Sequence, residues 1–425
     1  MVMKNFSLPI DKNIFVGIDV GSSKICCTIS GIDPIEGTFQ LLGIGTSSSS
    51  GVKMGSITHR DNLISEMEIA MREAETMAGA KVDSAIISIS SEQIRGINTQ
   101  GAIAIQKNQM SNVPIQHEIT ESDIQKVVDL AKGISLPIDR DILHVLPQEY
   151  MIDTLDKIKD PVGMSGHRLE AHVHLITVGT TAATNVANCA QELGIVVDGL
   201  VFQGLASGAA VLDQDEKDLG VALVDLGEGT SDLAIYHEGG IRHTSVLGIG
   251  SGNITNDIAV MLQVGMEEAK QIKETYGSAK ASMSSPELEF DLPVKNGGLA
   301  RKISEHELSR YVEARTEEIL RLVKRDIIRA GLKDNLTYGV VLTGGGANLK
   351  NIIGLAEEVL ELPVRIGKPK GIQDSVGVAS DPQFSAAVGL GIWRYRPDEL
   401  QSNYEIESPI QNTMRKVIEW FKDFF

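Results

Sequence analysis

Two segments of the chain carry the same pattern of residues that could bind phosphate. The first, from Asn13, reads NIFVGIDVGSSKICCTIS, and the second, from Gly220, reads GVALVDLGEGTSDLAIY. Each runs from an apolar strand through an Asp and glycines to a polar turn and a second apolar strand, which predicts a β-hairpin. Glycines let the backbone approach an anion, turn N–H groups and hydroxyls donate to it, and the Asp can hold a hydrated Mg²⁺. Two such hairpins, one in each half, predict paired domains around one polyphosphate.

A third glycine turn follows in YGVVLTGGGANLKNIIGLAEEV. A buried strand is expected over 340–342, and it runs into Gly344, Gly345 and Gly346 and then a helix. Because these three residues have no side chain, the turn can lie flat against a nucleoside. The three segments together predict a nucleotide site assembled from both halves.

The composition bounds the kind of protein that carries these turns. A chain of 425 residues predicts two or more domains, and 42% hydrophobic with 23% charged residues is typical of globular proteins. A net charge of −18 argues against non-specific nucleic-acid binding, and it makes attraction to an anionic membrane a property of one local segment. Three cysteines offer no disulfide framework, which fits a reducing cytosol. We expect neither a signal peptide nor a membrane-spanning helix.

The order of hairpin, hairpin and LTGGGA resembles the actin, heat-shock chaperone and sugar kinase superfamily over residues 12–397. The resemblance implies an α/β, actin-like two-domain ATPase fold that binds ATP with Mg²⁺. It also implies three loops, which are a first phosphate loop, a second phosphate loop and an adenosine loop. The first phosphate loop would contain Gly21, Ser22, Ser23 and Lys24. The second would contain Gly227, Gly229 and Thr230, and the adenosine loop would contain Gly344, Gly345 and Gly346.

Roles inside this site follow from side-chain chemistry. Asp19 and Asp225 would organise Mg²⁺, partly through water, because their negative charges need a cation between them and the phosphates. Gln203 stands at a helix start, where the superfamily often places the residue that orients the attacking water; a helix cap is the alternative interpretation. No segment identifies a base or a pocket for an acceptor alcohol. We therefore expect at most slow ATP hydrolysis, with the nucleotide acting mainly as a polymerisation switch.

Two positions depart from the superfamily pattern. Glu228 occupies the middle of the second phosphate loop, where a carboxylate facing phosphate would repel it, so we expect its side chain to point away. In GMEEAKQIKETYG, Lys273 matches the lysine that packs beside adenosine. Lys270 falls where a ribose-binding Glu is common, so either Glu267 makes that contact from one turn earlier or the contact is missing.

Residues 85–166 have a pattern of their own. Alternating strands in SAIISIS and TQGAIAIQ precede ITESDIQKVVDLAKGI, where Thr120 and Asp123 have the spacing of a capping box. The following apolar positions recur at helical spacing, at Ile124, Val127, Val128 and Ala131. We interpret the block as a small α/β subdomain inserted into the first half.

This block, together with HVLPQEY, IKDPVGMSGHRLEAHVHLIT and GLASGAAVL, closely resembles the FtsA family of bacterial cell-division proteins. The resemblance extends along nearly the whole chain. It implies an ATP-binding protein that polymerises on the cytoplasmic face of the inner membrane at the division septum and anchors FtsZ filaments. Arg301 and Lys302 would receive the acidic C-terminal peptide of FtsZ, although solvated surface charge is the alternative. The insertion, called 1C in the family, would contact FtsN or other later division proteins.

The resemblance also implies a division into subdomains. Subdomain 1A would comprise 12–84 and 167–205, with 1C inserted at 85–166. Subdomain 2A would comprise 206–244 and 305–397, with 2B at 245–304. A linker at 398–411 and an amphipathic helix at 412–425 would follow.

The last stretch, NTMRKVIEWFKDFF, predicts a helix that binds membrane. Its apolar residues recur at spacings of three and four, and basic and acidic residues occupy the other face. So short a helix is marginal in water and must bury its apolar face. Docking onto the parent domain is one possibility, but the polar linker and the aromatic content favour an interfacial helix on anionic lipid. The membrane residues would be Met414, Val417, Ile418, Trp420, Phe421, Phe424 and Phe425.

Two other functions remain open at this point. A small-molecule kinase of the same superfold would show substrate-dependent phosphoryl transfer. An actin-like scaffold of a pilus or secretion assembly would share the nucleotide site and the insertion, but the amphipathic tail argues against it.

Overall fold

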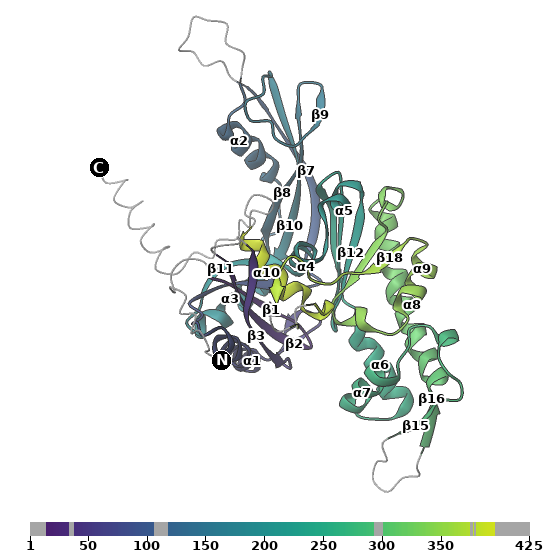
Figure 1. The fold of residues 1–425 in the computed structure, drawn as a ribbon. Helices are drawn as coiled ribbons and strands as arrows, with labels where there is room; N and C mark the ends of the chain where they lie inside the picture. The colour runs from purple at the N-terminus through teal and green to yellow at the C-terminus, as the bar shows by residue number, and fades with distance from the viewer. Residues whose placement is uncertain are drawn as a thin grey trace, which may run out of the picture.

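The computed structural model describes residues 14–33, 38–105, 118–292, 301–374, 377 and 380–395. Two large mixed sheets form the body, and helices lie against them (Figure 1). The inserted strands and α2 (Glu121–Lys132) project at one end of the molecule, and α6, α7 and the β15–β16 hairpin project at the other. The actin-like α/β fold predicted from the glycine turns is confirmed.

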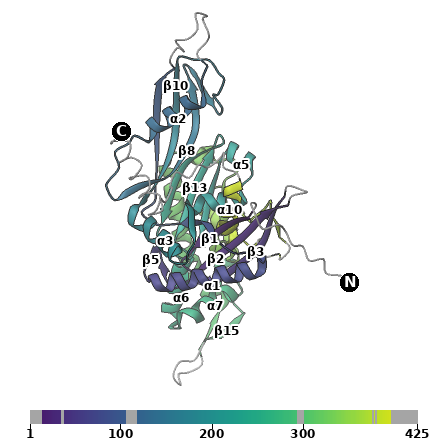
Figure 2. The ribbon, with the colours of Figure 1, turned by 90° about the vertical axis from the view of Figure 1, so that its left-hand side faces the viewer.

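The first sheet has six strands and carries the first phosphate turn. Its order is β11 (Val196–Phe202), β6 (Ser84–Ile89), β1 (Ile14–Val20), β2 (Lys24–Ile32), β3 (Phe39–Ser48) and β19 (Gln373–Asp374). Helix α1 (Arg60–Ala78) packs along β2 and β3, as Figure 2 shows from the side, and α3 (Thr180–Glu192) contacts β11. The predicted β1–β2 hairpin is present, with Asp19 paired to Cys26.

The second sheet has nine strands and carries the second phosphate turn. Its strand β12 (Val221–Leu226) is buried at every position and apolar except at Asp225, as expected for a strand covered on both faces. The predicted hairpin with β13 and the predicted strand before the glycine turn, β17, are both present. The order is β18 (Val364–Ile366), β17 (Val340–Thr343), β12 (Val221–Leu226), β13 (Ser231–His237), β14 (Gly240–Leu247), β7 (Arg95–Ala104), β10 (Arg168–Gly179), β8 (Arg140–Ile152) and β9 (Leu155–Ile158).

The last four strands of that sheet belong to the insertion. β10 pairs along its length with β7 and β8, so the inserted sheet continues to Gly179, beyond the predicted end at 166. β6 pairs with β1 of the first sheet, so the insertion begins after β6 and not at 85. The predicted capping box at α2 is present, because the Thr120 N–H donates to the Asp123 carboxylate at 3.2 Å. The insertion joins the rest of the sheet where β7 pairs with β14, through the single residue pair Arg95 and Ser245.

The remaining helices complete the second half. The longest, α8 (Glu305–Arg329), starts at Ser304, whose hydroxyl accepts the Glu307 N–H at 3.1 Å. Among the described residues, no helix is long and apolar enough to span a membrane. The other elements are α5 (Gln214–Leu219), α6 (Ser251–Leu262), α7 (Met266–Tyr276), α9 (Ile352–Leu360), β15 (Glu289–Leu292), β16 (Arg301–Ser304), β4 (Val52–Lys53), β5 (Ser56–Ile57) and the short 3-10 turns η1 (Ala281–Met283), η2 (Lys333–Asn335), η3 (Gly345–Asn348) and η4 (Pro382–Phe384).

Two helices cross at the centre of the body. α10 (Ser385–Tyr395) packs against α4 (Gln203–Val211) and β1, and the Thr28 hydroxyl of β2 donates to the Ala387 carbonyl of α10 at 2.8 Å. The crossing is close because Gly389 has no side chain: a Cβ there would lie 1.8 Å from the Ala206 carbonyl oxygen. α10, near the end of the described chain, thus lies in the core of the first half.

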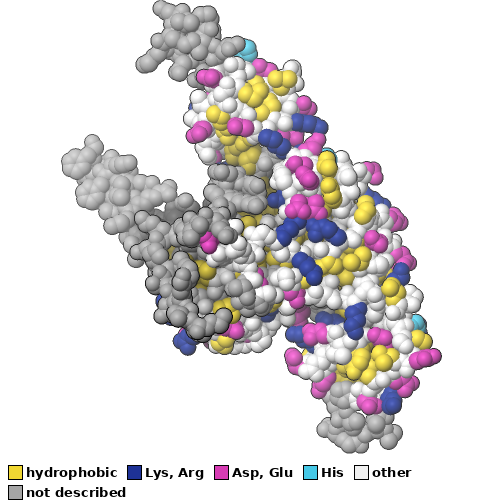
Figure 3. Space-filling view, in the orientation of Figure 1, with side chains coloured by type: hydrophobic (Ala, Val, Ile, Leu, Met, Phe, Trp, Pro, Cys, Tyr) yellow, Lys and Arg dark blue, Asp and Glu magenta, His cyan; other side chains and the backbone are white. Residues whose placement is uncertain are grey.

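The chain has a net charge of −18, and on the face shown in Figure 3 the acidic residues of the described surface do not form one continuous field. On the face shown in Figure 3, Asp and Glu side chains are scattered over all parts of the described surface, with Lys and Arg among them. This distribution favours solubility and short-range ion pairs over long-range steering of a charged ligand to this face.

We expect Gly389→Ala to destabilise the protein by about 1–3 kcal/mol, since the new methyl group meets backbone that cannot change rotamer. Gly354→Ala in α9 is the matched control: its Cβ would meet nothing closer than Lys280 Cδ at 3.9 Å. The control should be neutral or stabilising by up to about 1 kcal/mol, because Ala is the better helix former. Urea unfolding of both variants measures the difference, and equal stability would contradict the crossing geometry.

Candidate nucleotide-binding site

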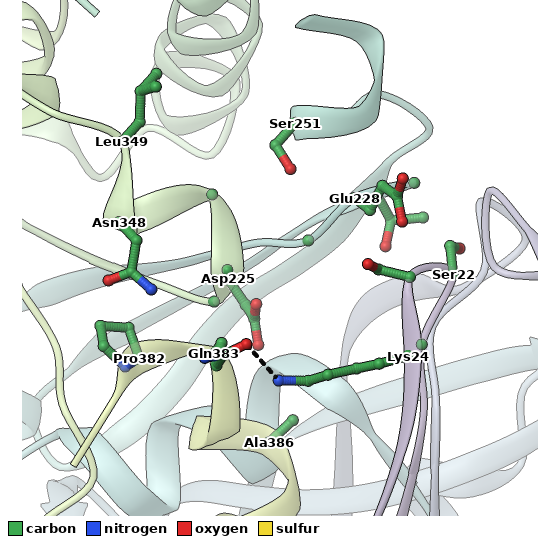
Figure 4. Close-up of a pocket in the computed structure, with 18 of the residues that line it drawn as sticks. Ser22, Lys24, Asp225, Glu228, Ser251, Asn348, Leu349, Pro382, Gln383 and Ala386 are labelled. Atoms are coloured by element: carbon green, nitrogen blue, oxygen red, sulfur yellow. Dashed lines mark hydrogen bonds between the residues drawn. The ribbon is translucent and has the colours of Figure 1, made fainter. Parts of the chain in front are cut away.

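A cavity of about 390 Å³ lies where the two halves meet. The three glycine turns all line it, with Gly21, Ser22, Ser23 and Lys24 from the first, Gly227, Glu228, Gly229 and Thr230 from the second and Gly344, Gly345 and Gly346 from the third. Figure 4 shows side chains from these turns converging on one space. The structure therefore brings together the loops that the sequence predicts for phosphate and nucleoside.

The two phosphate turns have the same backbone geometry. The Gly21 N–H donates to the Lys24 carbonyl at 3.1 Å, and the Gly227 N–H donates to the Thr230 carbonyl at 2.9 Å. A Cβ on Gly21 would lie 2.7 Å from the Lys24 carbonyl oxygen, and a Cβ on Gly227 would lie 3.0 Å from that of Thr230. Glycine is thus required at the equivalent point of both turns.

The amino end of α6 lies against the second turn. The Ser251 N–H donates to the Gly227 carbonyl and the Gly252 N–H donates to the Glu228 carbonyl, both at 2.8 Å. These two carbonyl oxygens, which would repel a phosphate, are thereby hydrogen-bonded to the amino end of α6. A helix N-terminus is itself favourable for an anion. The second turn is a cradle for negative charge.

Asp19 and Asp225 are buried in the cavity lining, Asp232 is buried outside it, and each of the three carboxylates accepts a hydrogen bond from a serine. Ser88 donates to Asp19 at 2.7 Å, Ser207 donates to Asp225, and Ser90 donates to Asp232 at 2.7 Å. Burial raises the pKa of all three, that of Asp225 to about 6, and the charges of its neighbours add to the effect at Asp232. Asp232 was not anticipated from the sequence, although it ends the motif DLGEGTSD.

This arrangement fits a divalent cation. Asp19 and Asp225 line the cavity and are 5% and 2% exposed, so their charges are poorly hydrated. In the described part of the chain, no group of three or more His, Cys, Asp or Glu side chains could hold a metal alone. Asp19 and Asp225 would thus supply part of the ligand shell of Mg²⁺, and phosphate oxygens and water would complete it.

Lys24 extends along the cavity floor instead of into the phosphate turn. Its ammonium donates to the Gln383 side-chain carbonyl at 3.0 Å and lies 3.8 Å from the centre of the Phe384 ring (Figure 4). Burial lowers the pKa of Lys24, and the nearby Asp19, Asp381 and Asp225 act in the opposite direction. Lys24 is the positive charge that lies near the buried carboxylates.

The turn of the β4–β5 hairpin was missed by sequence reasoning. The Gly55 N–H donates to the Ser22 hydroxyl at 3.3 Å, and Gly55 lines the cavity. A Cβ on Gly229 would lie 2.9 Å from the Met54 backbone and 2.5 Å from the Ser22 hydroxyl oxygen. This turn therefore connects the two phosphate loops. Met54 and Gly55 form the turn with positive φ angles. The sequence VKMGSI does not indicate that this turn contacts either phosphate loop.

On the nucleoside side of the cavity, the charged residues of α7 that line the wall differ from those expected. Lys273 lines it and is anchored by hydrogen bonds to the Thr255 hydroxyl at 2.8 Å and the Ser251 carbonyl at 3.3 Å. Lys270 and Glu274 also line the cavity, whereas Glu267 is exposed on α7 and does not. Of the two alternatives for the ribose contact, this lining gives no support to Glu267, and the contact stays a prediction. Glu274 is the carboxylate on α7 that the cavity includes.

Two further predictions can be placed. Glu228 is among the lining residues, and a Cβ on Gly252 would lie 2.7 Å from its Cγ, so the side chain packs beside the start of α6. Gln203 lines the cavity as the first residue of α4, with Phe202 at the cap position, and its side-chain amide acts to lower the pKa of Asp225. Gln203 is thus not the helix cap.

The predicted partner residues lie away from this cavity. Arg301 and Lys302 are exposed on β16, paired with Leu292 and Asp291 of β15. The predicted linker and amphipathic helix, with all the membrane residues, lie outside the described part of the chain.

Solved structures share the fold. The PilM–PilN type IV pilus biogenesis complex matches with a TM-score of 0.60 and 15% identity, covering 89% of this chain and 97% of that one. MreB5 of Spiroplasma citri bound to ADP matches with a TM-score of 0.52 and 15% identity, covering 90% and 97%. The same MreB5 bound to AMPPNP gives 0.52 and 15%, covering 96% and 99%. At this identity they establish the actin-like fold and nothing more specific.

Curated relatives and family models are more specific. The chain is 34% identical to the cell division protein FtsA of Pseudomonas aeruginosa, covering 97% of this chain and 98% of that one, and 32% identical to FtsA of Escherichia coli, covering 98% and 99%. The model of the cell division protein FtsA matches residues 222–389, and the model of the SHS2 domain inserted in FtsA matches 91–177. The chain therefore belongs to the FtsA family of cell-division proteins.

Proposed function

We propose that the protein binds ATP with Mg²⁺, polymerises on the cytoplasmic face of the membrane and anchors FtsZ filaments of the division ring. The observation that carries the nucleotide part is the cavity itself, in which two equivalent phosphate turns face each other across buried carboxylates. Fold relatives solved with ADP and AMPPNP support an adenine nucleotide. The family supports the division role, and the kinase and pilus-scaffold alternatives have no comparable support.

The roles in the cavity follow from charge. Asp19 and Asp225 would hold Mg²⁺, partly through water, and Mg²⁺ would neutralise charge on the phosphates. Ser22, Ser23, Gly21 and the second turn, Gly227 to Thr230, would donate to the phosphates, and Lys273 would lie beside the nucleoside. Gln203, near Asp225, would orient water for slow hydrolysis.

The β15–β16 hairpin would receive FtsZ. Arg301 and Lys302 are adjacent exposed cations on a two-stranded hairpin at the end of the molecule opposite the insertion (Figure 1). An acidic peptide could form ion pairs with both, although each exposed pair contributes little alone. The insertion, at the opposite end, would be the contact for FtsN or another later division protein.

The 412–425 segment would attach the protein to anionic lipid. Its short apolar face allows reversible binding by one copy, and a filament that presents many copies gains avidity without new contacts. Polymerisation and membrane attachment would therefore reinforce each other.

A graded series at Gly345 tests the nucleotide site. A Cβ there would meet only Gln383 Cβ, at 3.9 Å, so a methyl group fits, and because Gly345 lines the cavity a larger side chain would take up room beside the nucleotide. We expect Gly345→Ala to weaken ATP binding slightly. Gly345→Leu should weaken it at least about 10-fold, because displacing part of the nucleotide costs about 1–2 kcal/mol or more of binding free energy. Calorimetric titration with Mg·ATP measures this, and unchanged unfolding midpoints are the control. Full ATP affinity in Gly345→Leu would place the nucleotide elsewhere.

Charge reversal tests the FtsZ contact. We expect Arg301→Glu with Lys302→Glu to weaken binding of the acidic FtsZ C-terminal peptide by about 10-fold or more, more strongly at low salt, because exposed charges are screened. Fluorescence anisotropy of a labelled peptide measures the loss. Arg321→Glu, an exposed charge on α8 paired with Glu317, is the matched control. Equal affinities in all three proteins would exclude this hairpin as the peptide site.

Sedimentation with liposomes containing anionic lipid tests the tail. We expect the full chain to pellet with lipid, more so with ATP, and a chain ending at Gln411 to remain in the supernatant, because the apolar face is removed. Phe421→Glu in the full chain should reduce pelleting in the same direction. If the truncated and full chains pelleted alike, the tail would not be the anchor.

A further inference from the structure

A row of four hydrogen-bonded side chains connects the phosphate end of the cavity to its nucleoside end, and Figure 4 shows three of them, Lys24, Gln383 and Asn348. Lys24, at the first phosphate turn, donates to Gln383 Oε1 at 3.0 Å. Gln383 Nε2 donates to Asp381 Oδ2 at 3.0 Å, and Asp381 Oδ1 accepts from Asn348 Nδ2 at 2.8 Å. Asn348 ends η3, the turn that contains Gly345 and Gly346. The row therefore joins the phosphate lysine to the adenosine loop.

The chemistry of the row fixes the amide of Gln383. An ammonium group can only donate and a carboxylate can only accept, so Gln383 must direct its oxygen at Lys24 and its nitrogen at Asp381. Asp381 holds Gln383 a second time, because its Oδ1 also accepts the Gln383 backbone N–H at 3.0 Å. Gln383 is thus a fixed acceptor for Lys24, and it lines the cavity itself.

Lys24 is held at this point by weak partners. A neutral amide oxygen and the face of Phe384 replace water around its ammonium, and burial lowers its pKa. A phosphate oxygen is a stronger partner, since hydrogen bonds between two charged groups are roughly twice as strong as neutral ones. A polyphosphate in the two turns would therefore compete with Gln383 for Lys24.

We infer that Gln383 is a positioning residue for Lys24, which it holds at the cavity floor until a polyphosphate takes the lysine over. The inference rests on the proposed nucleotide function and deepens it. In this inference ATP draws the Lys24 ammonium off the cavity floor toward the phosphate turns, which lengthens the Lys24–Gln383 hydrogen bond, and its loss lowers ATP affinity. AMP, with its one phosphate next to the nucleoside, leaves the bond intact. Gln383 thus sets how strongly the site distinguishes ATP from AMP.

Two substitutions of similar size separate this role from a structural one, because they shift ATP affinity in opposite directions. Gln383→Met removes the acceptor, so ATP should bind about 3-fold more tightly while AMP binding stays unchanged. Gln383→Glu gives Lys24 a charged partner, so ATP should bind about 10-fold more weakly, with a smaller effect on AMP. Gln40→Met, at a glutamine bonded to Asp33 and Gln373 far along the sheet, is the matched control.

Two further experiments show whether the effect of Gln383 on ATP affinity passes through Lys24. In a Lys24→Met background the Gln383→Met substitution should change neither affinity, which is the signature of a coupled pair in a double-mutant cycle. Acylation of Lys24 by an amine reagent, followed by mass spectrometry, gives a readout that does not depend on nucleotide affinity. Lys24 should react faster in Gln383→Met than in the unaltered chain.

The outcomes are distinct. Opposite shifts for ATP that vanish without Lys24 support the inference. Equal weakening of ATP and AMP by both Gln383 variants, or a shift that persists in Lys24→Met, would overturn it and leave nucleotide binding intact. Failure of the unaltered chain to bind ATP would refute the proposed function and the inference together. If Gln383→Glu fails to fold, Gln383→Met and the acylation rate decide alone.

Discussion

Three buried carboxylates with one lysine near them are the constraint on which the centre of this structure depends. Asp19, Asp225 and Asp232 lie on strands from both halves, and serine hydroxyls are the partners that hold them. A hydroxyl supplies one hydrogen bond and no charge, so the carboxylates remain costly to bury. These carboxylates are surrounded by both phosphate turns, the amino end of α6 and Lys24.

Local geometry was readable from the sequence, and long-range contacts were not. The two hairpins, the strand before the glycine turn and the capping box at α2 each depend on residues within a few positions, and all are present. Ser90 and Asp232 are far apart in the chain, as are Lys24 and Gln383, and no short motif marks their contacts. These pairs arise only when the sheets are assembled.

The prediction for Glu267 met a related limit. Helical periodicity shows which residues share a face, but it does not show which turn of α7 reaches the cavity. The structure includes Lys270, Lys273 and Glu274 in the lining and leaves Glu267 outside. An error of one turn, about 5.4 Å, is enough to remove a side chain from a ligand. The ends of the insertion were misplaced by a similar uncertainty, since strand pairing and not strand pattern assigns β6 and β10 to their sheets.

The position of α10 has a consequence for biosynthesis. Phe384, Val388, Leu390 and Trp393 belong to the core of the first half, and β19 closes the edge of its sheet beside β3. The amino-terminal half therefore lacks part of its core until α10 has been translated, so it cannot complete its folding on the ribosome ahead of the second half. The segment proposed to bind lipid follows α10 in the chain, so it emerges only after every residue that lines the candidate nucleotide cavity.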